Sequence, residues 1–313
     1  MTADHTLAIK ENVPLAPYTS FGIGGPARWF VQPSNLQELE AALSFAKQRA
    51  VPYYILGGGT NVLISDKGFD GLVIRMGLDT IRMEGEMVTA QAGAPLAAVV
   101  DTAADCGASG IEWLAGIPGT IGGGIRGNAG AYGATIGEFV AHIIALDAAT
   151  GEPASYTRDE CRFAYRTSLF KSNPHLIVIS TTLQLSAGKP GEIRARMKEI
   201  LRKRGAIMEN EKSVGSYFVN PVPEDEQLIQ KFEADRKIVC RNCMIPAGWF
   251  IDRAGLRGTR VGGAMVSEKH GNYLINTGTA SAADMVNLAR LIKQRVLEEM
   301  GIELQEEVNY VGF

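Results

Sequence analysis

The spacing of apolar residues predicts alternating helices and strands over the first two thirds of the chain. Ser34 and Gln37 form a capping-box pattern, and the leucines that follow recur at helical spacing. Gly107 lies where a second periodic segment ends, and glycine is common just after a helix. We expect helices over 36–49, 95–106 and 192–204. We expect strands over 53–56, 72–75, 87–92, 140–147 and 176–185, with a turn at 149–151.

The last third of the chain, from about Ser213, is predicted to contain helices and short strands. Its longest helix should begin at the Ser-Ala-Ala-Asp sequence of 281–284 and end at Gly301. The buried positions of this helix are predicted to be Val286, Ala289, Ile292, Val296 and Met300. The other expected elements are helices over 224–235 and 247–255 and strands over 273–276 and 302–311. We expect the final strand to return to the sheet of the middle region.

Together these elements predict an α+β fold with three parts. A chain of 313 residues is long enough for two or three domains with cores of their own. We expect a small α/β domain at 1–76 and a larger α+β domain at 77–205, which the C-terminal strand at 302–313 joins. The remaining residues, 206–301, would form a third α+β domain.

The composition limits the classes of partner. A net charge of −3 and a pI near 5.9 argue against nucleic acids and anionic membranes. No apolar run reaches the ~18 residues of a membrane span, and the N-terminus lacks the features of a signal peptide. The four cysteines do not make a disulfide scaffold, and Cys240 and Cys243 lack the further ligands of a zinc site. We therefore expect a reduced, cytoplasmic protein that binds no metal, no nucleic acid and no membrane.

Two glycine-rich segments indicate a ligand site. Eight of the eighteen residues over 116–133 are glycine, and a second run, Gly-Gly-Gly-Thr-Asn, occupies 57–61. Bare backbone of this kind can place successive N–H groups against a flat or anionic ligand. Neither segment has the spacing of a P-loop or of a Rossmann turn. The two segments predict one large ligand held from two sides, and the alternative is a pair of tight turns.

The glycine-rich segments belong to a longer series of motifs. The most specific is EWLAGIPGTIGG at 112–123 followed by NAGAYG at 128–133. The others lie, in order, at 19–25, 56–63, 163–168, 215–221 and 262–270. With these motifs the chain resembles the UDP-N-acetylenolpyruvoylglucosamine reductases, flavoenzymes of bacterial peptidoglycan synthesis, over nearly its whole length.

The resemblance implies a two-part FAD-binding module at 1–205 and a substrate-binding domain at 206–301. It implies FAD as cofactor, NADPH as electron donor and a nucleotide sugar as substrate, in a protein that we expect to be a monomer. FAD should be bound non-covalently, because residues 57–69 contain no histidine or cysteine to tether it. The cofactor-binding residues implied are Gly57, Gly58, Gly59, Thr60, Asn61, Gly119, Thr120, Gly123, Gly124, Asn128, Ala129 and Gly130.

The resemblance also implies three catalytic residues, Arg166, Ser216 and Glu307. Arg166 would stabilise the negative charge that develops next to the substrate carboxylate, and Ser216 would donate the proton. Glu306 neighbours Glu307, and side chains alternate along a strand, so only one of the two can face the site. The motif favours Glu307. The implied substrate-binding residues are Tyr132, Tyr165, Asn220, Arg257 and His270.

The chain departs from the family pattern in two ways. Val219 occupies a position where many relatives have lysine. The segment after Arg166 is short, whereas the stretch at 221–248 is long, so the sequence leaves open what closes over the substrate. Two other functions stay open at this stage: a flavin oxidase of the same architecture that acts on another sugar or alcohol, and a nucleotide-sugar binding protein without catalysis.

Overall fold

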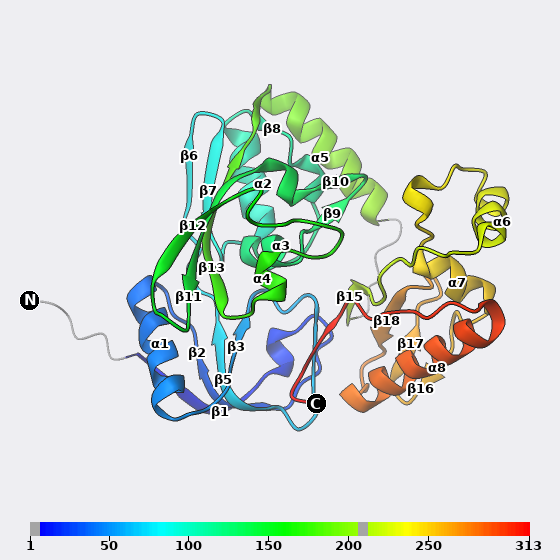
Figure 1. Cartoon of the computed structure of the whole chain (residues 1–313), viewed down its shortest axis with the longest axis horizontal. Coiled ribbons are helices and arrows are strands. Elements are labelled where there is room, and N and C mark those ends of the chain that lie inside the picture. Colours follow the sequence, from blue (N-terminus) through cyan, green and yellow to red (C-terminus); the bar gives the residue numbers. More distant parts are fainter. Residues whose placement is uncertain (1–6, 206–211) are drawn as a thin grey trace, which may run out of the picture. The chain divides into compact units, whose positions relative to one another are not determined.

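The computed structural model describes residues 7–205 and 212–313, and these residues form two compact units (Figure 1). The first unit contains residues 7–13, 27–59 and 69–205. The second contains residues 14–26, 60–68 and 212–313. Helices and strands are mixed in both units, which confirms the predicted α+β class. The segments 14–26 and 60–68 belong to the second unit although the expected domain boundaries assign them to 1–76. The three-domain division itself stays a prediction.

The first unit begins with a small sheet of strand order β1-β2-β5-β3. Its strands are β1 (Lys10–Pro14), β2 (Pro26–Val31), β3 (Tyr53–Leu56) and β5 (Phe69–Arg75), and β5 runs parallel to both β2 and β3. Helix α1 (Leu36–Gln48) packs its buried face, Leu39, Ala42 and Ala46, into the core of this unit. Asn35 is the N-cap of α1 and accepts a hydrogen bond from Glu38 N at 2.9 Å. The cap therefore lies one residue after the predicted Ser34.

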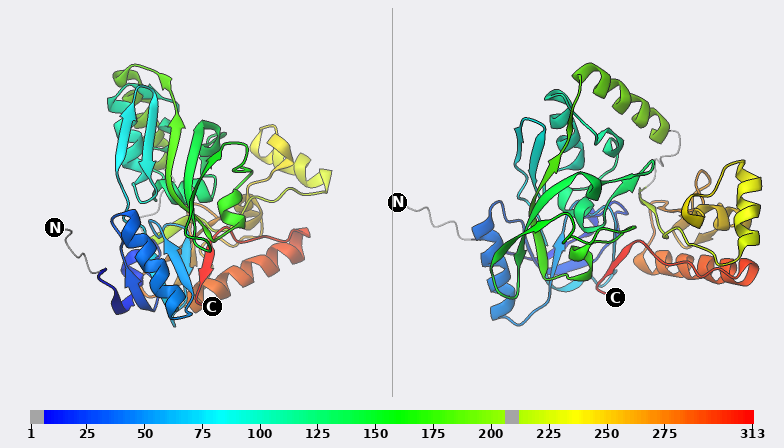
Figure 2. Two further views of the ribbon diagram at one scale, coloured as in Figure 1. Left: turned by 60° about the vertical axis from the view of Figure 1, so that its left-hand side comes forward. Right: turned by 45° about the horizontal axis from the view of Figure 1, so that its top comes forward.

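A larger antiparallel sheet completes the first unit, with strand order β12-β11-β13-β7-β6. Its strands are β6 (Ile81–Glu84), β7 (Met87–Gln91), β11 (Val140–Asp147), β12 (Pro153–Thr157) and β13 (Leu176–Gln184). Helices α2 (Leu96–Asp105) and α5 (Pro190–Gly205) contact each other, where Arg194 of α5 pairs with Asp101 and Asp105 of α2 (Figures 1 and 2). The helices and strands expected here occur within two residues of their predicted bounds.

The long glycine-rich segment contains a helix that the sequence did not predict. Helix α3 (Ile121–Arg126) follows Thr120, whose hydroxyl accepts a hydrogen bond from Gly123 N at 3.4 Å. A Cβ atom on Gly122 would lie 2.7 Å from Ala92 Cβ, so α3 packs too closely on the chain there for any other residue. The unit also contains α4 (Leu169–Ser172) and the short strands β8 (Ala108–Ser109), β9 (Gly130–Ala131), β10 (Ala134–Thr135) and β14 (Ser186–Ala187).

The second unit is built on a sheet of order β15-β18-β17-β16. Its strands are β15 (Lys212–Ser216), β16 (Arg260–Val261), β17 (Ala264–Val266) and β18 (Tyr273–Asn276). Its helices are α6 (Glu226–Arg236), α7 (Ala247–Arg253) and α8 (Ala282–Met300). Helix α8 packs against β16, β17 and α7 (Figure 1). It buries Met285, Leu288, Ala289, Ile292 and Val296. Of the predicted stripe, Val286 and Met300 are only partly buried.

The C-terminal strand is the element whose position was predicted wrongly. It is confined to β19 (Asn309–Val311), and it pairs in parallel with β4 (Val62–Ile64) within the second unit. It does not join the larger sheet of the first unit, where we expected it, because its backbone groups bond to β4. None of the described helices combines the length and the apolar character that crossing a membrane requires.

Candidate functional site

The two glycine-rich segments meet in the first unit, as the sequence predicted for a ligand held from two sides. Gly57 follows β3, and a Cβ atom placed on it would lie 2.8 Å from the hydroxyl of Thr120 at the start of α3. The expected cofactor-binding residues Gly57–59 and Gly119–130 thus lie on neighbouring loops. Thr60 and Asn61 follow directly in the chain but belong to the second unit.

Gly123 differs from its neighbours in what surrounds it. A Cβ atom there would meet one described atom, Thr120 Oγ1 at 3.6 Å, which is ordinary contact. Gly122 is required by Ala92, and Gly119 by its φ of +124°. Gly123 is exposed, and no described part of the chain needs glycine at this position. Gly123 lies in the first turn of the short helix α3, and an exposed glycine there lets a flat cofactor approach the backbone closely, so these residues fit FAD.

Asn128 is buried, and both polar atoms of its side chain bond to backbone. Its Oδ1 accepts a hydrogen bond from Gly137 N at 3.1 Å, and its Nδ2 donates to Ala164 O at 2.9 Å. The residue, at φ +44°, therefore connects the glycine-rich segment to the loop that precedes Arg166. A cofactor contact of Asn128 stays a prediction, and its side chain is already engaged by the protein. The other expected cofactor-binding residues nearby are Gly124, four residues before Asn128, and Ala129 and Gly130, which follow it.

Arg166 lies beside the same segment. Its Nη1 donates to Gly130 O at 3.2 Å, and Lys171 Nζ donates to Arg166 O at 2.8 Å. The backbone of Arg166 is left-handed, with φ +54°, a conformation that costs energy in a residue other than glycine. The guanidinium also lies 5.4 Å from the ring centre of Tyr165. The fold thus holds a cation at the glycine-rich segment 116–133.

Two tyrosines of this unit, both expected to bind substrate, are exposed. Tyr165 lines a pocket of 460 Å³ together with Asn128, Thr135, Gly137, Glu138, Arg158, Asp159, Arg162, Phe163 and Ala164. Tyr132 is 57% exposed, and the guanidinium of Arg204 from α5 lies 5.1 Å from the centre of its ring. Arg204 also donates to Trp113 O at 3.1 Å, so α5 supports the glycine-rich segment. Sequence reasoning did not identify Arg204.

Ser216 and Glu307 are brought together in the second unit. Ser216 ends β15, just after Gly215 at φ +81° and at a register shift in the pairing with β18. The next residue, Tyr217, accepts a hydrogen bond from Glu307 N through its carbonyl at 2.8 Å. Asn61 Nδ2 donates to Glu307 O at 3.2 Å. Three residues far apart in sequence therefore lie on adjacent segments.

Glu306 and Glu307 have different surroundings. The Glu306 carboxylate pairs with Lys293 Nζ of α8 at 3.0 Å. Glu306 also forms an isolated bridge with Phe218, whereas the strand β19 begins only at Asn309. Since Glu306 is committed to α8, the geometry agrees with the preference for Glu307 as the residue of the site. A role of Glu307 in catalysis stays a prediction.

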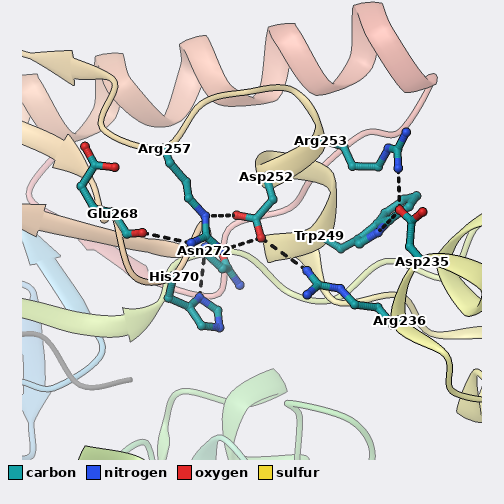
Figure 3. A network of polar contacts seen from close by, with 9 residues as sticks. All are labelled: Asp235, Arg236, Trp249, Asp252, Arg253, Arg257, Glu268, His270 and Asn272. Atoms are coloured by element: carbon teal, nitrogen blue, oxygen red, sulfur yellow. Dashed lines mark hydrogen bonds and ion pairs between the residues drawn. The ribbon is translucent and has the colours of Figure 1, made fainter. Parts of the chain in front are cut away.

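The remaining substrate-binding candidates lie in the second unit as well. Asn220 Oδ1 accepts a hydrogen bond from Ala247 N at 3.0 Å. The guanidinium of Arg257 forms a bidentate pair with Asp252, at 2.6 and 2.7 Å, and donates to Glu268 O at 3.0 Å (Figure 3). His270 Nδ1 accepts from Asn272 N at 3.2 Å, and burial lowers the pKa of its ring.

The predicted site residues thus form two groups. One group, Gly57–59, Gly119–130, Tyr132, Tyr165 and Arg166, belongs to the first unit, and the other, Thr60, Asn61, Ser216, Asn220, Arg257, His270 and Glu307, belongs to the second. Asp252, which pairs with both Arg257 and Arg236, and Arg236 itself were missed because ion pairs across a fold leave no local sequence signal. Among the described residues, no three His, Cys, Asp or Glu side chains form a metal site.

Two protein-family models match the chain. An FAD-binding domain family model matches residues 27–153, and a model of the C-terminal domain of UDP-N-acetylenolpyruvoylglucosamine reductase matches residues 207–311. UDP-N-acetylenolpyruvoylglucosamine reductase of Solibacter usitatus is 38% identical over 98% of this chain and 97% of its own length. The enzyme of that name from Rubrobacter xylanophilus is 36% identical, over 97% and 96%.

A solved structure extends the match to three dimensions. The crystal structure of UDP-N-acetylenolpyruvylglucosamine reductase from Thermus caldophilus has a TM-score of 0.77 and 32% identity. It covers 98% of this chain, which in turn covers 99% of it. Sequence and structure thus match over the same nearly complete length, which confirms the resemblance that the motifs indicated. The chain belongs to the UDP-N-acetylenolpyruvoylglucosamine reductase family.

Proposed function

We propose that this protein reduces the enolpyruvyl ether of UDP-N-acetylglucosamine to UDP-N-acetylmuramate, with NADPH as electron donor, in peptidoglycan synthesis. Family membership over the whole chain supports this activity. The observation that carries it is the hydrogen bond from Glu307 N to Tyr217 O, at 2.8 Å. It holds the two candidate proton-handling residues, Ser216 and Glu307, on adjacent segments of the second unit.

The cofactor of this reaction is FAD, and the first unit carries the matching FAD-binding domain. The residues that would hold it are Gly57, Gly58, Gly59, Thr60 and Asn61, together with Gly119, Thr120, Gly123, Gly124, Asn128, Ala129 and Gly130. When bound, FAD would carry hydride from NADPH to the vinyl carbon of the enol ether. The absence of histidine and cysteine from residues 57–69 supports a non-covalent cofactor.

The protein's own residues would handle the charge and the proton. Hydride addition leaves negative charge on the carbon next to the substrate carboxylate. Arg166 would bind that carboxylate through charge-assisted hydrogen bonds, which strengthen as the charge grows. Ser216 would hold the proton that this carbon takes up, and a carbanion is a base strong enough to accept it from a hydroxyl. Glu307, if protonated, would donate a hydrogen bond to the same carboxylate.

The substrate residues have separate tasks in this proposal. Tyr132 and Tyr165 present exposed rings in the first unit, and Arg257 presents a guanidinium in the second. The side chains of Asn220 and His270 accept hydrogen bonds from backbone N–H groups, which favours a role in shaping the site.

We also infer that the protein is a monomer in the cytoplasm, the compartment that contains both the nucleotide sugar and NADPH. Light scattering on a size-exclusion column tests the monomer.

Consumption of NADPH by the purified protein tests the reaction itself. Oxidation of NADPH should require the enolpyruvyl nucleotide sugar, and the product should gain two hydrogen atoms, which mass spectrometry measures. Turnover that depends on oxygen and ignores NADPH would instead support a flavin oxidase. Tight binding of the nucleotide sugar without any turnover would support a binding protein that has lost catalysis.

A further inference from the structure

Two arginines of the second unit share one carboxylate. Arg257 holds Asp252 in a bidentate pair, and Arg236, at the end of α6, approaches Asp252 Oδ2 with its Nη2 at 3.4 Å. Figure 3 shows the Asp252 carboxylate between the two guanidinium groups. Asp252 is mostly buried, with 20% of its side chain exposed, whereas the side chains of Arg236 and Arg257 are 49% and 40% exposed. One negative charge is thus matched by two accessible cations.

The position of Arg236 is set by its neighbour Asp235. The Asp235 carboxylate pairs with Arg253 of α7 and accepts a hydrogen bond from Trp249 Nε1 at 3.1 Å. Phe232 of α6 also packs edge-on against Trp249, with ring centres 5.7 Å apart. Helix α6 is therefore anchored to α7 independently of Arg236. Among the described residues, the contact with Asp252 is the one hydrogen bond or ion pair of the Arg236 side chain, which also acts electrostatically on His270.

Two exposed guanidinium groups and one mostly buried carboxylate offer an anion more hydrogen-bond donors than acceptors. Asp252 pairs with both arginines, and the exposed Glu268 carboxylate also acts electrostatically on Arg257. His270 is predominantly neutral near pH 7, since burial lowers the pKa of its ring. Glu268 accepts from Arg257 through its carbonyl, and its carboxylate points away from Arg236 in Figure 3. Guanidinium groups match the oxygens of a phosphate with two parallel N–H donors, so a phosphate is the anion that this pair suits.

Arg257 is connected to the segment that carries Ser216 through the chain at 268–272. Arg257 donates to Glu268 O, and two residues later His270 Nδ1 accepts from the backbone N–H of Asn272 at 3.2 Å. The side chain of Asn272 bonds to both backbone groups of Phe218, at 2.8 and 2.9 Å. The backbone carbonyl of Asn272 accepts from Tyr217 N at 2.8 Å. A ligand at Arg257 would therefore bind next to a stretch of chain that is hydrogen-bonded to the residues directly after Ser216.

We propose that Arg236 and Arg257 together bind the diphosphate of the nucleotide-sugar substrate, and that Asp252 positions both guanidinium groups for it. This inference rests on the proposed function, which supplies the nucleotide sugar as ligand. It assigns a substrate-binding role to the long 221–248 stretch, through Arg236. Asp252 acts on the substrate through the arginines and is a positioning residue.

Binding of UDP and of uridine to the FAD-containing enzyme tests the role of Arg236, since the two ligands differ by the diphosphate. Arg236→Gln should weaken UDP binding about 10–100-fold, the loss of a charged hydrogen bond, and leave uridine binding unchanged. The KM for the nucleotide sugar should rise by a similar factor, with kcat within about twofold. Calorimetry measures both ligands.

Arg253→Gln is the matched control, because Arg253 also pairs across α6 and α7 and is comparably exposed, at 37%. It should change UDP affinity less than about twofold. An equal loss of UDP affinity in Arg253→Gln and Arg236→Gln would overturn the proposal, because docking of α6 would then explain both. Unchanged UDP affinity in Arg236→Gln would overturn it as well.

Asp252→Asn separates positioning from simple neutralisation. The substitution raises the net charge of the cluster by one, so a purely electrostatic role predicts tighter binding of UDP. A positioning role predicts weaker binding and a higher KM, with a smaller change in kcat. Tighter binding would overturn the role that we assign to Asp252. If the wild-type enzyme reduces the nucleotide sugar and Arg236→Gln has the same UDP affinity and the same KM as the wild type, this inference alone fails. If UDP binds as described and no reduction occurs, the proposed function fails.

Discussion

The two units present different chemical groups to a ligand. In the first unit, Gly57 and Gly123 expose backbone, while the polar side chain of Asn128 is turned inward to bond with Gly137 and Ala164. In the second unit, side chains carry the chemistry, as in the arginines that flank Asp252. A flat cofactor needs close backbone approach, whereas a charged substrate needs specific charged partners.

This difference implies opposite sensitivities to mutation. A site made of bare backbone is damaged when atoms are added, because a new side chain occupies the space of the ligand. A site made of side chains is damaged when atoms are removed. Arg166 is the exception in the first unit, since its side chain is the candidate group there.

Gly123→Leu should abolish FAD retention and with it all activity, while the protein still folds, since a Cβ at this position meets only Thr120 Oγ1 at 3.6 Å. Flavin absorbance per mole of folded protein is the measurement. Gly191→Leu is the control: Gly191 is also an exposed helical glycine with no atom near its Cβ, and this variant should keep its FAD. Full FAD occupancy in folded Gly123→Leu would mean that Gly123 does not lie against the cofactor and that its glycine serves only the local backbone.

Ser216→Ala should fold, retain FAD and accept hydride from NADPH at nearly the wild-type rate. Its reduction of the enol ether should be slower by about 10²–10⁴-fold, the usual contribution of a positioned general acid. Ser216→Cys keeps a proton donor and should recover part of the rate. Stopped-flow measurement of each half-reaction separates the steps. Wild-type reoxidation of the flavin by substrate in Ser216→Ala would show that the proton comes from another group.

Arg166→Ala should slow the substrate half-reaction by about 10²–10³-fold, since it removes one stabilising donor of the developing negative charge. Reduction of the flavin by NADPH should change much less, because that step builds no such charge. The same stopped-flow traces report both rates. Equal slowing of the two half-reactions would make Arg166 a scaffold residue, consistent with its bond to Gly130 O.

Asn128→Ala should lower the free energy of unfolding by about 1–3 kcal/mol, because it leaves Gly137 N–H and Ala164 C=O without their buried partner. Urea unfolding of the FAD-free protein measures this without a contribution from the cofactor. Asn287→Ala on the exposed face of α8 should change stability by no more than about 0.5 kcal/mol. If Asn128→Ala lowered the free energy of unfolding by no more than this control, the structural role of Asn128 would be contradicted.

The smallest effect concerns pH and His270. Burial depresses the pKa of this ring in the folded state, so the unfolded chain binds a proton more readily. The contribution of His270 to the free energy of unfolding is therefore fully present above the pKa of the ring in the unfolded chain, about 6.5. It is lost as the pH falls through the lower pKa of the ring in the folded protein. His270→Gln should flatten the pH dependence of urea unfolding between about pH 7 and 5. An unchanged slope would contradict the prediction.

Local patterns predicted the six longest helices within two residues of their bounds and the strands β3, β7, β11, β13 and β18 within one, but twelve of the nineteen described strands were not predicted. The strands β11 and β18 have the bounds that their apolar runs indicated, and α8 begins at the Ser281 capping box and ends at Gly301 with φ +68°. Helix α3 was missed because glycine is a poor helix former. What stabilises α3 is the Thr120 cap and the packing of Gly122 on Ala92, and the second of these is a contact between distant residues.

Apolar periodicity, caps and ordered motifs were sufficient to predict the α+β class, the longer helices, five strands and the family with its candidate residues. The pairing of β19 with β4, the inward orientation of Asn128 and the sharing of Asp252 by Arg236 and Arg257 are visible only in the folded chain. The two sets of features differ in the distance along the chain over which they act. Periodicity and capping act between neighbours in the chain, whereas strand pairing and ion pairs join residues whose proximity only the folded chain creates.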